Sequence, residues 1–219
     1  MNAQRIAELI ERYEVNFILD VGANICQYAE LLRNLGYEGR IASFEPVRQF
    51  YDVLAEKAAA DAKWDVYELA LGSDEGTAEL NVTPNTLSSI HTASEYGSER
   101  FHSLRHTVVQ EVQVRRLENL LDDLMPEGLD NVRIFLKMDT QGFDLEVFSG
   151  LGRHMRSIVG IQSEMALLTI YEGMPRMPEA LSAYEEAGFE VAGMAPVNQD
   201  GRTLRILEYD CLMVRSDCV

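Results

Sequence analysis

The chain has 219 residues, a length typical of one domain, with 47% hydrophobic and 25% charged residues. Both fractions are close to those of soluble globular proteins and argue against a disordered or fibrous chain. Lysine and arginine number 19 against 36 aspartate and glutamate residues, so the formal net charge is −17. Because affinity for nucleic acid comes from clustered basic side chains, nucleic acid and anionic membrane surfaces are disfavoured as partners.

The cysteine content and the apolar pattern indicate the compartment. Three scattered cysteines are too few for a disulfide framework or a zinc finger, which favours a reducing compartment. Residues 1–15 place their apolar side chains at helical spacing and lack the unbroken apolar core of a signal peptide. No stretch approaches the ~20 apolar residues of a membrane span. We therefore expect a soluble cytoplasmic protein with no membrane span.

The first third of the chain alternates strand-like and helix-like segments. Strands are predicted at 16–21, 40–44 and 64–69, and helices at 25–35 and 47–60. Strand, helix and strand in this order are the signature of a doubly wound α/β sheet with short right-handed connections.

A long polar segment interrupts this alternation. Residues 77–82 and 108–114 alternate like exposed strands, and the residues between them are polar. A loop of this length inside a compact domain is usually functional or partly disordered. We interpret Pro84 to His106 as an active-site lid, inserted at about 83–107 into a single domain that spans 1–219.

The alternation resumes after this segment. The remaining predicted elements are a helix at 117–124, strands at 132–139 and 157–163, helices at 143–148 and 178–187, and strands at 189–193 and 204–214. No internal repeat or linker marks a domain boundary.

The turn after the first strand reads Asp20-Val-Gly-Ala-Asn24. In open α/β sheets, ligands bind at the carboxyl ends of the strands, and a glycine such as Gly22 lets the backbone approach them closely. Glu45 ends the next strand and follows Gly22 by roughly 20 residues. An acid at this distance in the sequence is placed to accept hydrogen bonds from ribose hydroxyls. Gly22 and Glu45 together indicate an adenosine-containing cofactor, although a plain tight turn and a solvated acid would give the same spacing.

Two missing glycines discriminate among such cofactors. A dinucleotide site needs Gly-x-Gly-x-x-Gly to accommodate a pyrophosphate, but Asn24 and Gln27 occupy the second and third positions. An adenosine with an amino-acid tail, as in S-adenosylmethionine, needs less backbone clearance. Asp20 would place a carboxylate near its ammonium or sulfonium charge.

Four stretches resemble, in this order, the FkbM-type S-adenosylmethionine-dependent methyltransferases. They are Asp20-Val-Gly-Ala-Asn24, Phe44-Glu-Pro46, Ala70-Leu-Gly72 and Lys137-Met-Asp-Thr-Gln-Gly142. The resemblance extends over about 16–214. It implies an α/β fold with a doubly wound, Rossmann-like class I methyltransferase sheet, mostly parallel with a final antiparallel strand, and S-adenosylmethionine as the cofactor.

The same resemblance implies cofactor contacts along the first three strands. The methionine part would be lined by Asp20, Gly22, Asn24 and Tyr28, the ribose held by Glu45, and the adenine flanked by Ala70 and Leu71.

The sequence departs from the family pattern at three positions. Cys26 stands where the family commonly has glycine, and Gln141 and Asp144 stand where glutamate is frequent. The cysteine raises the alternative of a displaced backbone or a narrower pocket, and with it that of a non-catalytic cofactor-binding module.

Position on the fourth predicted parallel strand singles out Asp139 as the catalytic candidate. Lys137 and Asp139 are two residues apart and share one face of the strand. A carboxylate at the carboxyl end of this strand faces the transferable methyl group and can orient the acceptor hydroxyl or take its proton. A structural ion pair between Lys137 and Asp139 is the alternative. Glu164 ends the next strand and is a second candidate, or a surface acid.

The polar segment adds further candidates. His91 follows Ser88 and Ser89 and is a candidate base, although a loop surface position is equally consistent with the sequence. His102 and His106 are four residues apart, which is a metal-ligand spacing on a helix, but no third ligand accompanies them, so no metal is expected. Candidates for substrate contact are Ser88, Ser89, Lys137 and Gln141.

The expected function is S-adenosylmethionine-dependent methyl transfer, most readily to a hydroxyl oxygen of a small molecule or sugar. The expected partner is that substrate, with a homodimer left open. A non-catalytic cofactor-binding module and a nicotinamide-dependent oxidoreductase are the alternatives, the latter disfavoured by Asn24 and Gln27.

Overall fold

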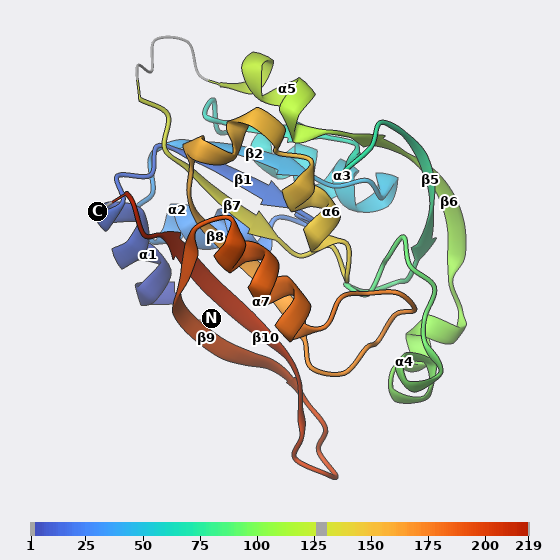
Figure 1. The fold of residues 1–219 in the computed structure, drawn as a ribbon. Helices are drawn as coiled ribbons and strands as arrows, with labels where there is room; N and C mark the ends of the chain where they lie inside the picture. The colour runs from blue at the N-terminus through green and yellow to red at the C-terminus, as the bar shows by residue number, and fades with distance from the viewer. Residues whose placement is uncertain (1–2, 126–130, 219) are drawn as a thin grey trace.

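The computed structural model describes residues 3–125 and 131–218, and a seven-stranded sheet forms its centre (Figure 1). The strand order is β3-β2-β1-β7-β8-β10-β9. The bounds are β1 (Phe17–Val21), β2 (Arg40–Phe44), β3 (Trp64–Tyr67), β7 (Ile134–Met138), β8 (Ile158–Ala166), β9 (Phe189–Gln199) and β10 (Ile206–Arg215).

The sheet is parallel from β3 to β8, and β10 runs antiparallel to both β8 and β9. This arrangement confirms the predicted mostly parallel α/β sheet with a final antiparallel strand. The strand order reverses between β1 and β7, and in such sheets the ligand site lies at this switch point.

Helices cover both faces of the sheet. One face is covered by α1 (Ala3–Arg12), α2 (Gln27–Asn34) and α3 (Arg48–Ala58), and the other by α5 (Leu117–Leu124), α6 (Asp144–Ser149) and α7 (Met177–Glu186). Side chains alternate between faces along a strand, so Ile18 packs with the first set of helices and Leu19 with the second. Burial on both faces explains why β1 is apolar at nearly every position.

The three strands β4 (Ala70–Leu71), β5 (Gly76–Val82) and β6 (Val108–Arg115) form a separate sheet in the order β4-β6-β5. Their alternation predicted exposed strands, but not this second sheet. Leu80, Val112 and Val114 from its inner face pack against Val47 at the start of α3. The small sheet therefore encloses the region next to the carboxyl end of β2.

The segment predicted as a lid contains regular structure. It includes α4 (Glu95–Arg100) and the 3-10 helix η1 (His102–Arg105), and an antiparallel bridge joins Ala93 to Tyr171. His102 and His106 would share one helical face only if residues 98–106 formed a single helix. They do not, because α4 ends at Arg100 and η1 ends at Arg105. Within the described residues, no group of three or more potential ligands is placed to hold a metal ion.

Strand β9 extends to Gln199, six residues beyond the predicted end. Pro196 lies within this extension and lacks an N–H, which is tolerated because β9 is at the edge of the sheet. The hairpin that it forms with β10 projects beyond the helices (Figure 1). Among residues 3–125 and 131–218, no helix is long and apolar enough to cross a membrane.

Two glycines of the family-like stretches have a packing role. A Cβ atom added to Gly150 would lie 2.3 Å from the carbonyl oxygen of Gly72. Any side chain at this position must therefore push the end of α6 away from the segment that follows β4.

We predict that Gly150→Ala lowers the free energy of unfolding by ~1–3 kcal/mol, the range for overpacking a buried contact. Urea denaturation measures the change. The matched control is Gly193→Ala, since an added Cβ there meets no atom within 4 Å. Equal stabilities of the two variants would contradict this packing role.

Candidate active site

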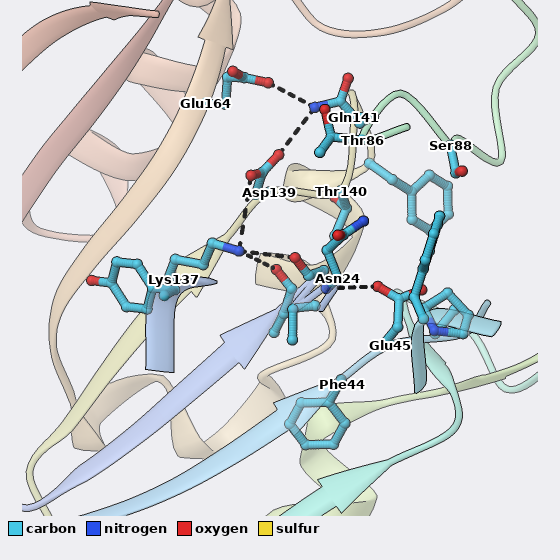
Figure 2. Close-up of a pocket in the computed structure, with 18 of the residues that line it drawn as sticks. Asn24, Phe44, Glu45, Thr86, Ser88, Lys137, Asp139, Thr140, Gln141 and Glu164 are labelled. Atoms are coloured by element: carbon cyan, nitrogen blue, oxygen red, sulfur yellow. Dashed lines mark hydrogen bonds and ion pairs between the residues drawn. The ribbon is translucent and has the colours of Figure 1, made fainter. Parts of the chain in front are cut away.

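A cavity of about 360 Å³ lies at the carboxyl ends of β1, β2 and β7 (Figure 2). It is therefore at the switch point of the sheet, where the sequence places it. Apolar side chains line the end nearest β2 and β4, and polar side chains line the end nearest β7 and β8. The two ends can accommodate chemically different parts of a ligand.

Glu45 lies between these ends and is only 5% exposed. Its Oε2 accepts a hydrogen bond of 2.8 Å from the Asn24 N–H, and its Oε1 accepts one of 2.7 Å from the Val47 N–H. Burial raises the pKa of Glu45 to about 7, and the two backbone donors oppose that rise. The carboxylate lines the cavity and retains lone pairs that can accept hydrogen bonds from ribose hydroxyls.

The turn after β1 approaches the turn after β7 very closely. A Cβ atom on Gly22 would lie 2.0 Å from the Asp139 carbonyl oxygen, and Gly22 has a φ of 72°. Asn24 and Cys26 also have positive φ values, 50° and 92°. Cys26 therefore adopts the left-handed conformation for which glycine is the usual residue. Its side chain is buried among the residues of α2 and does not line the cavity.

Asp20 and Lys137 form an ion pair beneath this turn. The Lys137 Nζ lies 3.1 Å from Asp20 Oδ1 and donates to the carbonyl oxygen of Gly22 at 3.0 Å. Burial alone would lower the pKa of Lys137, but the charges of Asp20 and Asp139 outweigh it, so this pKa is raised. Asp20 is completely buried and is not among the lining residues, whereas Lys137 is.

Tyr28 lines the part of the cavity next to Lys137, where the methionine part of the cofactor is expected. Its ring lines the cavity, with the Lys137 Nζ 5.7 Å from the ring centroid. Its hydroxyl donates to Gln162 Oε1 at 3.2 Å. Gln162 is a lining residue on β8 that sequence reasoning did not single out.

The apolar end is formed by the last residue of β2 and by residues that follow β3. Phe44, Leu69 and Leu71 line it, and Ala70 contributes at the edge of the small sheet. The Phe44 ring stacks on Tyr67 with centroids 5.2 Å apart. A flat aromatic group such as adenine fits such a surface.

Asp139, Gln141 and Glu164 meet at the polar end (Figure 2). Asp139 Oδ2 lies 3.9 Å from the Lys137 Nζ, so the ion pair considered as the structural alternative for Asp139 is present, at a longer distance than the 3.1 Å between Lys137 and Asp20. Burial, followed by the charge of Asp139, raises the pKa of Glu164 well above its ordinary value. Asp210 from β10 lines the same end and was not predicted.

Asp144 has a structural position. It is buried, and its carboxylate accepts from the Thr140 N–H, the Thr140 hydroxyl, the Ser163 hydroxyl and the Glu164 N–H. These contacts tie the turn after β7 to the end of β8. Asp144 therefore sets the positions of Asp139 and Glu164 without lining the cavity.

Of the residues predicted for the site in the polar segment, some line the cavity and others do not. Ser88 lines the cavity, but Ser89 and His91 do not. Ser89 is buried, and its hydroxyl donates to the Gln141 carbonyl oxygen at 2.7 Å. The His91 ring packs on Phe143 with centroids 5.6 Å apart. The structure therefore brings Asp139 and Glu164 together and leaves His91 behind the cavity wall.

The residues present fit S-adenosylmethionine. Gly22 leaves no side chain at the closest approach of the two turns, a buried acid is available for the ribose, and the apolar end suits an adenine. A sheet with this strand order and a site at its switch point defines a class I methyltransferase fold.

The chain belongs to the FkbM methyltransferase family, since the Methyltransferase FkbM domain matches residues 20–191. Methyltransferase sdnD of Sordaria araneosa is 27% identical over 199 residues, which cover 80% of this chain and 74% of that protein. The family resemblance and the methyltransferase class are thereby confirmed, with S-adenosylmethionine as the methyl donor, and the nicotinamide alternative is not supported.

Solved structures share the fold. Magnesium protoporphyrin IX methyltransferase (ChlM) from Synechocystis PCC 6803 has a TM-score of 0.51 and 8% identity, over 98% of this chain and 78% of that one. Fibrillarin from Aeropyrum pernix has a TM-score of 0.50 and 12% identity, over 91% and 66% of the two chains.

The pKa of Glu45 leads to a pH prediction. If Glu45 holds the ribose as the sequence predicts, ribose hydroxyls would donate to its ionised carboxylate. Protonation near pH 7 would remove one acceptor, so the affinity should fall as the pH is lowered. We expect the S-adenosylmethionine Kd to rise about tenfold from pH 8 to pH 6. Calorimetry measures it.

Glu45→Gln supplies the control, because it cannot titrate. It should bind the cofactor ~1–3 kcal/mol more weakly at pH 8, with no slope between pH 6 and 8. A wild-type Kd that is constant over this range would remove Glu45 from the ribose site.

Proposed function

We propose that this protein transfers a methyl group from S-adenosylmethionine to a hydroxyl oxygen of a small molecule or sugar, with Asp139 as the base. The observation that carries the proposal is the position of Asp139, at the carboxyl end of β7 and on the polar wall of the cavity (Figure 2). Carboxylates are suited to orient a hydroxyl and to take its proton.

The reaction needs alignment and a proton acceptor. When bound, S-adenosylmethionine supplies a methyl group on a positively charged sulfur, and the electron pair of the broken carbon–sulfur bond stays on that sulfur. Asp139 would accept the hydroxyl proton as the acceptor oxygen forms its bond to carbon, and would later release that proton to water. Because the Asp139 side chain is 45% exposed, competing water would be excluded only once the cofactor and the acceptor fill the space beside it.

The cofactor contacts follow from the two ends of the cavity. Glu45 would hold the ribose, Ala70 and Leu71 would flank the adenine, and Gly22, Asn24 and Tyr28 would line the methionine part. Asp20 would act indirectly, by holding the Lys137 ammonium at the cavity wall.

The volume of the cavity, about 360 Å³, is within the ~300–1,000 Å³ typical of small-molecule sites. The cofactor would occupy much of this volume, so the acceptor would bind at the partly exposed end beside Asp139. Contacts to the acceptor would come from Ser88, Lys137, Gln141 and Glu164.

The test has two steps. Calorimetry with S-adenosylmethionine, S-adenosylhomocysteine and NAD establishes the cofactor. A screen of small alcohols, phenols and sugars for S-adenosylhomocysteine release then establishes turnover, with methylated product identified by mass spectrometry. Tight cofactor binding with no product from any acceptor would favour the non-catalytic alternative, and product methylated on nitrogen would contradict the hydroxyl acceptor.

We predict that Asp139→Asn lowers kcat by ~10²–10⁴-fold, the usual contribution of a general base, while the cofactor Kd changes less than about twofold. The amide keeps the shape of the side chain and loses its ability to accept a proton. Stopped assays of product formation measure kcat. Asp123→Asn, on an exposed part of α5, is the matched control. Normal turnover by Asp139→Asn would show that Asp139 is structural.

We also propose that the segment from Pro84 to His106 closes over the acceptor, since Thr86, Ser88 and Ile90 from it line the cavity. Amide hydrogen exchange in this segment should slow at least about threefold when S-adenosylhomocysteine and the acceptor are bound. Amide exchange in the seven-stranded sheet, which contains no residue of this segment, serves as the internal reference. Equal exchange in the free and bound forms would contradict closure.

A further inference from the structure

The side chain of Gln141 connects the two acids at the polar end of the cavity. Its Nε2 donates to Asp139 Oδ1 at 3.0 Å and to Glu164 Oε2 at 2.9 Å (Figure 2). A primary amide nitrogen has two hydrogens, and here each one is directed to a different carboxyl group. Gln141 thus provides one neutral donor group between two groups that would otherwise repel each other.

The orientation of this amide is fixed from its other side. The Tyr171 hydroxyl has two acceptors at 3.0 Å, Gln141 Oε1 and the Leu87 carbonyl oxygen, between which its one proton is shared. The carbonyl end of the amide therefore faces the tyrosine, and the nitrogen faces the acids. Burial raises the pKa of Tyr171, which keeps its hydroxyl protonated and able to donate. Gln141 therefore makes a chain of contacts from Tyr171 to both acids.

The backbone of Gln141 is held in an unfavourable conformation. Its φ is 54°, in the left-handed region that non-glycine residues seldom adopt, and it is followed by Gly142 with a φ of 95°. The Ser89 hydroxyl holds its carbonyl oxygen, and the residue is only 8% exposed. Such a conformation persists when surrounding contacts over-determine it, and it is common at functional sites.

The two acids have different surroundings. Asp139 faces Lys137, Gln141, Glu164 and Asp144, and its side chain is 45% exposed. The groups that face Glu164 are all acids or neutral donors: Asp139, Asp144, Glu208, Asp210, Gln141 and Tyr171. Among the described residues, Lys137 forms an ion pair with Asp139, whereas the charges that act most strongly on Glu164 are those of acids. A negative charge is therefore more stable on Asp139 than on Glu164.

We propose that Gln141 is the positioning residue of the acceptor end: its amide keeps Asp139 in the proton-accepting, ionised form and leaves the single proton of the pair on Glu164. This inference rests on the proposed function, since it assigns to Gln141 the preparation of the proposed base. With one hydrogen of the amide on Oδ1, Asp139 keeps Oδ2, which lies 3.9 Å from the Lys137 Nζ, as the oxygen that can accept the hydroxyl proton.

The consequence is a defined division of roles between two similar acids. If the two carboxyl groups shared a proton directly, some of the molecules would present a protonated Asp139 to the acceptor hydroxyl. An amide between them prevents that exchange, because it donates to both and accepts from neither. A glutamate at position 141 would instead place a third acid within hydrogen-bond distance of the two.

The experiment measures protonation directly and does not require the acceptor. The protein is labelled with ¹³C at the aspartate and glutamate side-chain carboxyl carbons, and its NMR spectrum is recorded from pH 4 to 9. The signals of the two acids are assigned with Asp139→Asn and Glu164→Gln. Gln141→Met keeps the length of the side chain and removes both donors, and Gln141→Glu replaces the amide by a carboxyl group. Gln113→Glu, exposed on β6, adds the same charge elsewhere.

We expect Glu164 to titrate at a higher pH than Asp139 in the wild type. In Gln141→Glu, the titration midpoint of Asp139 should rise by about one pH unit, a tenfold gain in proton affinity, and in Gln141→Met by about half of that. Gln113→Glu should leave both midpoints unchanged. Either of two results would overturn the proposal. One is an Asp139 midpoint that is the same in the wild type and in both Gln141 variants, and the other is a wild type in which Asp139 titrates above Glu164.

Calorimetry with S-adenosylmethionine on the same samples keeps the two proposals distinct. A shifted Asp139 midpoint together with an unchanged cofactor affinity supports a positioning role for Gln141. A general loss of structure would instead weaken cofactor binding as well. A failure of every protein to bind the cofactor would contradict the proposed function, while the titrations would still decide the role of Gln141.

Discussion

The ion pair between Asp20 and Lys137 is the contact on which the arrangement of this site depends. The two residues are direct partners in the register of β1 and β7, the central strands of the sheet. A one-residue slip of either strand would leave a buried charge without its partner, which is far less stable than the pair. The ammonium also binds the carbonyl oxygens of Val21 and Gly22, so the same contact fixes the turn at the switch point.

Much of the fold could be predicted from the sequence, because buried parallel strands have a strong apolar signal. The strands at 16–21, 40–44 and 132–139 and the final antiparallel strand were expected within a few residues. The small sheet was not, since the alternation over 77–82 shows a half-buried strand without showing its partner. The helix α4 was also missed, because its polar residues carry little periodicity.

Site residues were predictable where they follow an apolar, strand-like run. They were not predictable where they act only by holding another site residue through hydrogen bonds. Glu45, Asp139 and Glu164 follow apolar runs, and the structure places all three on the cavity wall. His91 had only its proximity in sequence to Ser88 in its favour, and its ring instead packs on Phe143. Asp144 and Tyr171 act by hydrogen bonds across 20 or 30 positions of sequence, for which one sequence contains no signal.

Backbone strain collects around the cavity. Of the five non-glycine residues with positive φ among the described residues, Asn24, Cys26 and Gln141 belong to the turns after β1 and β7. At Cys26 the backbone adopts a left-handed conformation that suits glycine, and the thiol is buried away from the cavity. Strain of this kind is tolerated where packing over-determines the backbone. Both turns are held in that way, one by the Lys137 ammonium and the other by Asp144. The two strained turns touch at Gly22 and Asp139 and together line the cavity, so they form one continuous surface against which a methyl donor and an acceptor can be aligned.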